Sequence, residues 1–293
     1  MSNDASNRLR AQVLEKRSAL VLGVDPRLER VPFGFPGLEG LLAFHRRLIE
    51  LCAPYVVGIK PQVAFFEALG VEGLGLYAET CAMGKDAGLL VIGDVKRGDI
   101  GSTAEAYARA HFAWADWLTV NPLLGEDSVE PFLKVCREEG KGVFVLCATS
   151  NPSWRQFEGI VDGEGKAVYE HIADAICGWN AGFLEGGARG AGGEGEEFGD
   201  GALGPVGAVI GATHPEIVRA LRERMPRSWF LLPGVGAQGG KVADLGPAFL
   251  PDGTGALLPV SRGLGACFEP GDEDWEAKVV AQARALVEEY RGR

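Results

Sequence analysis

Short apolar runs alternate with longer amphipathic segments along most of the chain. The apolar runs are five to seven residues long, which is typical of parallel strands covered by helices on both faces. There are eight of them, at residues 19–25, 55–60, 89–94, 117–121, 142–148, 206–212, 229–234 and 256–261. Helical spacing of apolar residues is seen between and after them, at 40–53, 102–115, 128–139, 168–180 and 273–290.

This alternation predicts an α/β fold, and eight strands favour a single (β/α)8 TIM barrel over residues 1–293. An open doubly wound sheet has the same periodicity, so the apolar pattern alone leaves it open. Polar residues favour the barrel, because they follow the carboxyl ends of several strands and those ends share one rim in a barrel. They are Asp25, Lys60, Asp94, Asn121, Ser150, Gln238 and Arg262.

Residues 186–204 interrupt the pattern. They contain nine glycines in nineteen residues and almost no apolar side chains. Glycine loses the most conformational entropy on ordering, and little in this segment could be buried in return. We therefore expect a flexible loop before the sixth strand. A plain insertion explains this loop more simply than a functional element does.

Composition excludes several classes of function. A formal charge of −11 at pH 7 argues against nucleic-acid binding, because there is no basic excess to neutralise phosphates. Residues 1–17 lack the apolar core of a signal peptide, and no apolar run is long enough to cross a membrane. The six cysteines form no CxxC pair, which fits buried thiols in a reducing cytoplasm, and the four histidines share no metal-ligand spacing.

The segment GDVKRGDIGST, residues 93–103, concentrates charge at the end of an apolar run. Strand alternation places Asp94 and Lys96 on the same side of the chain. On the surface such a pair stabilises a protein by less than about 1 kcal/mol. At a partly buried barrel mouth, charges about 4 Å apart interact by roughly 4 kcal/mol. Ser102 or Thr103 can cap the helix that follows.

DVKRGDIGST resembles the DxKxxDI-x-x-T signature of the orotidine monophosphate decarboxylase family. Other motifs of that family follow in its order between about residues 19 and 265. They are GVDPR (23–27), GIKPQVAFFE (58–67), ATSNPS (148–153), PGVGAQGG (233–240) and SRG (261–263). The form of ATSNPS and the long insertions resemble the bacterial branch with longer chains. DxKxxD alone is shared with related sugar-phosphate lyases, so the resemblance depends on the whole set.

The resemblance implies cofactor-free and metal-free decarboxylation of orotidine 5'-phosphate to UMP, the last step of pyrimidine nucleotide synthesis. Lys96 would donate the proton to C6 of the pyrimidine. Asp94, Asp99 and Lys60 would complete an alternating charge network around it, in which opposite charges keep the lysine protonated. With no cofactor, preorganised electrostatics must supply most of the rate enhancement.

The resemblance also assigns contacts to the ribose and the base. Asp25 and Lys60 would bind the ribose, and Ser150 would read the amide edge of the pyrimidine. Without the family, Asp25 could be a turn residue, Lys60 a surface lysine, and Ser150 a cap or turn residue.

The substrate phosphate would be bound after the last two strands, where barrels commonly bind phosphate. Glycines of PGVGAQGG allow backbone N–H groups to approach an anion closely. Pro233 and Gln238 belong to this segment, and Ser261 and Arg262 follow the eighth strand, where the guanidinium can bind phosphate bidentately.

Members of the family are homodimers in which the equivalents of Asp99 and Thr103 reach the neighbouring subunit's site. The resemblance therefore implies a homodimer with these two residues contributed across the interface.

Three rival functions fit parts of the pattern. A hexulose-phosphate synthase would share the barrel and DxKxxD but use magnesium, and it would lack the ATSNPS and PGVGAQGG combination. A class I aldolase would need Lys96 or Lys60 as an amine nucleophile, whereas flanking carboxylates raise a lysine's pKa. A silent nucleotide-binding barrel would not require Asp94, Lys96 and Asp99 together.

Overall fold

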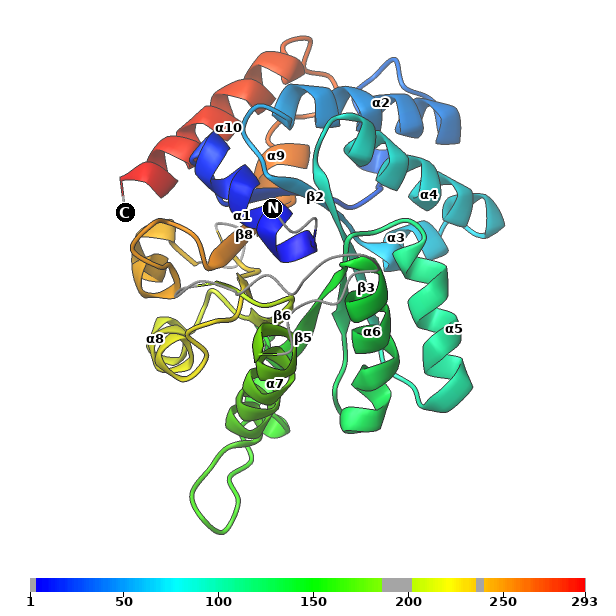
Figure 1. Cartoon of the computed structure of the whole chain (residues 1–293). Coiled ribbons are helices and arrows are strands. Elements are labelled where there is room, and N and C mark those ends of the chain that lie inside the picture. The colour runs from blue at the N-terminus through cyan, green and yellow to red at the C-terminus, as the bar shows by residue number, and fades with distance from the viewer. Residues whose placement is uncertain (1–3, 186–201, 236–239, 293) are drawn as a thin grey trace.

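The computed structural model describes residues 4–185, 202–235 and 240–292. Eight strands close into one barrel in sequence order, and each runs parallel to its neighbours (Figure 1). They are β1 Leu20–Val24, β2 Gly58–Pro61, β3 Leu90–Arg97, β4 Trp117–Val120, β5 Gly142–Ala148, β6 Val206–Ile210, β7 Phe230–Leu231 and β8 Ala256–Val260. Pairing of β1 with β8 excludes the open sheet, and the (β/α)8 TIM barrel is confirmed.

All eight predicted strands are present. β5 has the predicted bounds, β3 is longer than predicted, and the other six are shorter, β7 most of all. β3 continues three residues past the predicted end, so that Asp94 lies within the strand and Lys96 lies near its end. β7 has only two residues. Its regular pairing ends before Pro233, which has no amide N–H to donate to a neighbouring strand.

Helices surround the barrel, and five of them correspond to the predicted amphipathic patterns. These five are α2 Gly37–Cys52, α5 Gly101–Phe112, α6 Glu126–Glu139, α7 Val168–Glu185 and α10 Trp275–Arg291. The other helices are α1 Ala5–Lys16, α3 Val63–Glu67, α4 Val71–Asp86, α8 Pro215–Arg224 and α9 Arg262–Gly265, and the short 3-10 helices are η1 Leu28–Arg30, η2 Trp154–Gln156 and η3 Val242–Ala248.

Apolar side chains fill two layers, one between the barrel and its helices and one inside the barrel. The inner layer includes a stacked aromatic pair, Trp117 and Phe144, whose ring centroids are 4.7 Å apart. Gly142 makes room for it, because a Cβ at this position would lie 2.5 Å from the Trp117 ring. This inner layer supports the polar residues at the carboxyl ends of the strands, which we call the barrel mouth.

Helix α1 covers the opposite end of the barrel (Figure 1). Leu9 and Val13 pack into the inner apolar layer. The Ser6 hydroxyl donates to the carbonyl of Leu203 at 2.6 Å and accepts from the Trp229 indole at 2.9 Å. These contacts close the end of the barrel away from the mouth, so the mouth is where a ligand has access.

Most of the predicted flexible loop, residues 186–204, lies outside the described residues. Its last part is described, and it is not loose. Leu203 is buried in the inner apolar layer, and the Gly204 amide donates to the Arg227 carbonyl at 2.9 Å. Residues 202–204 are thus held against the barrel, and the flexible loop itself stays a prediction.

None of the helices in the described part of the chain combines the length and the apolar character needed to span a bilayer.

Candidate active site

Asp94 lies in the barrel mouth, and its carboxylate is bound between two lysines. Lys60 Nζ donates to Asp94 Oδ2 at 2.6 Å, and Lys96 Nζ donates to Asp94 Oδ1. Asp94 and Lys60 are buried, whereas the Lys96 side chain is 46% exposed. Lys96 therefore presents its ammonium to the open mouth while it stays bonded to a buried carboxylate.

Two opposing effects act on the pKa of Asp94. Burial alone raises the pKa of this carboxyl, because the charged form loses hydration. The charges of Lys60 and Lys96 and their hydrogen bonds outweigh burial, and the net result is a pKa below the ordinary value for aspartate. Asp94 is therefore a fixed negative charge at neutral pH.

Two further residues complete the shell around this carboxylate. The Thr119 hydroxyl on β4 donates to Asp94 Oδ1 at 3.0 Å, and the Gln62 amide donates to Asp94 Oδ2 at 2.9 Å. Each carboxylate oxygen thus accepts two hydrogen bonds. Neither residue was predicted as part of the site. A signal was present for Gln62, which follows Lys60 at a spacing of two, whereas a threonine within an apolar strand does not by itself indicate a site.

The backbone at Lys96 is unusual. β3 changes register against β4 between Gly93 and Arg97, and Lys96 adopts a left-handed conformation with φ of 45°. Its amide N–H donates to the Thr119 hydroxyl oxygen at 2.9 Å. This irregularity turns the chain at the point where Lys96 reaches into the mouth.

Asp99 and Thr103 lie beyond this turn and are not brought to Lys96 within one chain. Asp99 Oδ1 accepts from the Ile100 amide at 2.8 Å, and in the described part of the chain Asp99 forms no ion pair. Thr103 is exposed in the first turn of α5. The prediction that Ser102 or Thr103 caps this helix is wrong, because the helix begins at Gly101 and its N-cap position is Ile100.

A cavity of about 180 Å³ gathers predicted binding residues from four strand ends. Its described lining includes Asp25, Lys60, Pro233, Ser261 and Arg262. β1 contributes to this arrangement through a glycine. A Cβ at Gly23 would lie 1.9 Å from Ser261 Oγ, so only glycine leaves room for that serine. The cavity combines two cations and a carboxylate, which suits a ligand that carries both an anion and hydroxyl groups.

Ser150 lies after β5 and is not among the described residues that line this cavity. The residue before it, Thr149, is fixed by a glutamate. Glu158 accepts from the Thr149 amide at 2.7 Å and from the Thr149 hydroxyl at 2.8 Å. Gln238, the remaining predicted binding residue, lies outside the described residues.

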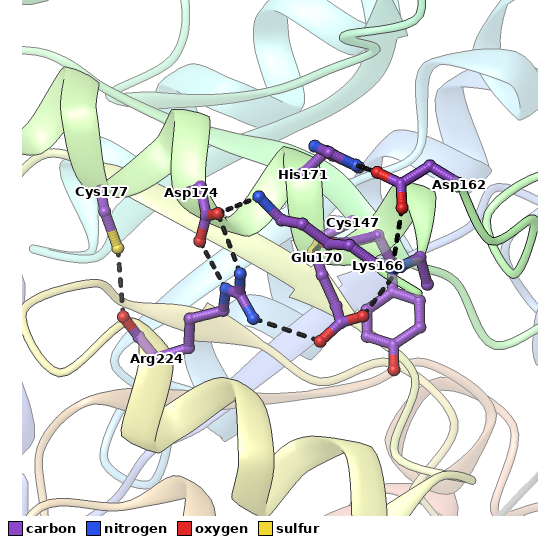
Figure 2. Close-up of polar contacts among 10 residues, drawn as sticks. Cys147, Asp162, Lys166, Glu170, His171, Asp174, Cys177 and Arg224 are labelled. Atoms are coloured by element: carbon purple, nitrogen blue, oxygen red, sulfur yellow. Dashed lines mark hydrogen bonds and ion pairs between the residues drawn. The ribbon is translucent and has the colours of Figure 1, made fainter. Parts of the chain in front are cut away.

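A second charged cluster, more exposed than the first, joins α7 to α8 (Figure 2). In it, Asp174 accepts from Arg224 at 2.9 Å and also binds Lys166, while Arg224 donates to Glu170 at 3.1 Å. We call these four residues the surface cluster. Their hydrogen bonds connect the end of the loop that follows β5 to two helices, so the surface cluster has a structural role.

Residues 4–185, 202–235 and 240–292 contain no group of three or more His, Cys, Asp or Glu side chains that could hold a metal ion.

Chemically, the mouth offers an exposed ammonium backed by an ionised carboxylate, next to a cavity with a guanidinium. An ammonium in this position can donate a proton and stabilise negative charge that develops beside it. The guanidinium can bind a phosphate.

Comparison with known proteins agrees with this arrangement. The model of the Orotidine 5'-phosphate decarboxylase / HUMPS family matches residues 19–264. The orotidine 5'-phosphate decarboxylase of Deinococcus radiodurans is 41% identical over 256 residues, which is 86% of each chain. That of Rhodopirellula baltica is 36% identical and spans 98% of this chain and 99% of its own.

The structure of Leishmania donovani OMP decarboxylase is 32% identical in sequence and superposes with a TM-score of 0.77, covering 98% of this chain and 97% of that chain. The resemblance seen in the sequence motifs is confirmed. With the model match covering most of the chain and relatives aligned over nearly its full length, this chain belongs to the Orotidine 5'-phosphate decarboxylase / HUMPS family.

Proposed function

We propose that this chain converts orotidine 5'-phosphate to UMP and CO2, without a metal or an organic cofactor, and that Lys96 is the proton donor. Family membership supports the reaction. The observation that carries the mechanism is the pairing of Asp94 with Lys96, in which the carboxylate is buried and the ammonium reaches the open mouth.

The chemical step requires charge stabilisation at one carbon. The bond between C6 and the carboxylate breaks, CO2 leaves, and the electron pair stays on C6. The Lys96 ammonium stabilises this negative charge and then transfers a proton to C6, and solvent reprotonates the amine. Because the ammonium is already fixed by Asp94, little reorganisation is needed as charge develops.

Charge balance in the mouth supports the same mechanism. Asp94 and Asp99 balance Lys60 and Lys96, so the substrate carboxylate adds one uncompensated negative charge. Its departure as neutral CO2 relieves repulsion. Stabilisation of the transition state by Lys96 is the larger contribution, since interactions that strengthen only there accelerate the reaction.

The remaining predicted residues bind the substrate in this proposal. Asp25 and Lys60 bind the ribose, and Ser261 and Arg262 bind the phosphate together with Pro233 and Gln238 of the glycine-rich segment. The location of five of these residues around one cavity supports the assignment. Ser150 reads the pyrimidine, from the loop that Glu158 holds in place.

Asp99 and Thr103 act in the mouth of the neighbouring subunit of a homodimer. In the described part of the chain neither residue forms a hydrogen bond or ion pair with Lys96, which supports this assignment. So does the apolar character of the adjoining surface, where Ile100 is 53% exposed and Leu123 is 81% exposed. Apolar residues exposed beside charged site residues are typical of a surface that another chain covers.

Subunit sharing can be tested by complementation. Asp94→Ala and Asp99→Ala chains are each expected to be inactive as homodimers. After subunit exchange, a heterodimer contains one mouth with both substitutions and one with neither, so part of the activity should return. Mass spectrometry verifies the exchange. Verified heterodimers that stay inactive would contradict sharing.

We also propose that the enzyme works in the cytoplasm. All six cysteines are free thiols, and four of them are buried. This usage suits a reducing compartment.

The proposed function is tested by an ultraviolet assay of orotidine 5'-phosphate conversion in the presence of a chelator. Wild type should convert the nucleotide with the chelator present, and Lys96→Ala should lower kcat by at least about 10⁴-fold. Binding of UMP to the variant, measured by calorimetry, shows that the site is intact. Equal rates for the two proteins would overturn the proposal.

A further inference from the structure

Thr119 is a buried threonine of β4 whose single hydroxyl contacts both Asp94 and Lys96. The hydroxyl donates to Asp94 Oδ1 at 3.0 Å and accepts from the Lys96 backbone amide at 2.9 Å. The residue is 1% exposed, so no solvent competes for these bonds. A hydroxyl has one donor and two acceptor lone pairs, and both kinds of site are used here.

The contact with Lys96 occurs where the backbone is least regular. Among the described residues, Arg17 and Lys96 are the non-glycine residues with positive φ, and Arg17 is simply a helix C-cap. A left-handed conformation is unfavourable for a non-glycine residue and persists only when its surroundings enforce it. The register shift also takes the Lys96 amide out of the regular β3–β4 ladder. Without Thr119 this amide would lose its partner.

The contact with Asp94 fixes the other half of the pair. Oδ1 is the oxygen that binds the Lys96 ammonium, and Thr119 donates to the same oxygen. The hydroxyl therefore fixes the carboxylate oxygen and the lysine backbone relative to each other.

We propose that Thr119 is a positioning residue, which holds the Lys96 backbone and the Asp94 carboxylate in the arrangement that aims the ammonium at the substrate. The proposal rests on the proposed role of Lys96 as proton donor. Thr119 lies behind the pair, so it acts on the chemical step rather than on binding. A displacement of about 1 Å at a reacting group can lower the rate by about 100-fold.

Two substitutions separate the hydroxyl from the rest of the side chain. Thr119→Val keeps the branched shape and removes the oxygen, and Thr119→Ser keeps the oxygen and removes the methyl group. We expect Thr119→Val to lower kcat about 10- to 100-fold while the Kd for UMP stays within about twofold, and Thr119→Ser to stay within about threefold of wild type in both.

A matched control is Thr254→Val. Thr254 is also fully buried, and its hydroxyl donates to a carboxylate, Asp252 Oδ1, at 2.6 Å, but it precedes β8 at the closed end of the barrel. It should lose stability without loss of kcat. If Thr119→Val does not fold, Thr119→Ala and Thr119→Ser give the same comparison, since they differ by one oxygen atom.

The outcomes are distinct. A lower kcat with unchanged UMP binding, restored by serine, supports the positioning role. Equal kcat for Thr119→Val and Thr119→Ser overturns it. A parallel loss of kcat and UMP affinity in Thr119→Val overturns it as well, and so does the same loss of kcat in Thr254→Val. Wild type that does not convert orotidine 5'-phosphate would instead refute the proposed function.

Discussion

Asp94 in the mouth and Asp174 in the surface cluster each bind two cations, yet their surroundings differ. Asp94 has a side chain that is 9% exposed, and it binds Lys60, which lines a cavity. Asp174 is 43% exposed and lies on the outer side of α7. The same pattern of two cations around one carboxylate therefore occurs once in a buried site and once in solvent.

The pKa values do not separate the two sites. The pKa of Asp174 is also lowered, first by its hydrogen bonds to Arg224 and then by those to Lys166. What differs is the weight of burial, which has the largest single effect on the pKa of Asp94 but ranks behind the Arg224 hydrogen bond at Asp174. A perturbed pKa marks a functional site only when burial and an adjacent cavity accompany it.

The largest difference between the two carboxylates should appear in activity. Asp94→Asn removes the charge that fixes both lysines, and we expect kcat to fall by about 10³-fold or more. Asp174→Asn should leave kcat unchanged. Steady-state assays of the two variants with orotidine 5'-phosphate give the comparison, and a large loss in Asp174→Asn would break it.

The second-largest difference between the two carboxylates should appear in their contributions to the stability of the fold. Asp94→Ala leaves two lysines unpaired, one of them buried, and breaking a buried pair in this way costs about 3–5 kcal/mol of unfolding free energy. Asp174→Ala should cost less than about 1 kcal/mol, because exposed ion pairs are weak. Urea unfolding measures both values. Similar losses for the two variants would show that burial does not set the strength of these pairs.

Acidification should weaken the Asp94 pair. Since the folded-state pKa of Asp94 lies below its unfolded value of 3.8, the pair contributes fully above about pH 5, and the contribution is lost as the pH falls through and below 4. The difference in unfolding free energy between wild type and Asp94→Asn should therefore shrink between pH 7 and pH 3. A difference that grows on acidification would reverse the assigned direction of the pKa shift.

Salt should produce the smallest effect. Raising the ionic strength from about 0.1 M to 1 M shortens the Debye length from about 10 Å to 3 Å, which screens exposed charges far more than buried ones. The small loss of stability in Asp174→Ala should become undetectable, while the loss in Asp94→Ala persists. Thermal unfolding at the two salt concentrations tests this, and equal sensitivity of the two variants would argue against it.

The sequence predicted eight strands because they are apolar on both faces, a local property that is readable in one chain, and the polar residues that follow them favoured a barrel over an open sheet. It missed α1 and α4 for physical reasons. The buried stripe of α1 is narrow and includes Ser6 among small and apolar residues, and α4 contains three glycines that obscure its periodicity. Both helices exist because tertiary contacts stabilise them.

Much of the candidate site was also readable, since Lys60, Asp94 and Lys96 follow apolar runs and lie together in the structure. The left-handed conformation of Lys96 was not readable, because it arises from the register shift between two strands. Thr119 was missed for the same reason. A threonine in a strand shows its role only when the neighbouring strand places a lysine amide beside it.

The position of α1 at the closed end of the barrel implies that this helix packs late in folding. Ser6 and Trp229 are 223 positions apart, so their hydrogen bond must wait until most of the chain has been synthesised. Helix α1 is synthesised first but is among the last elements to pack. Until it packs, the inner apolar layer at this end of the barrel is exposed to water. Hydrogen exchange during refolding should show late protection of this helix.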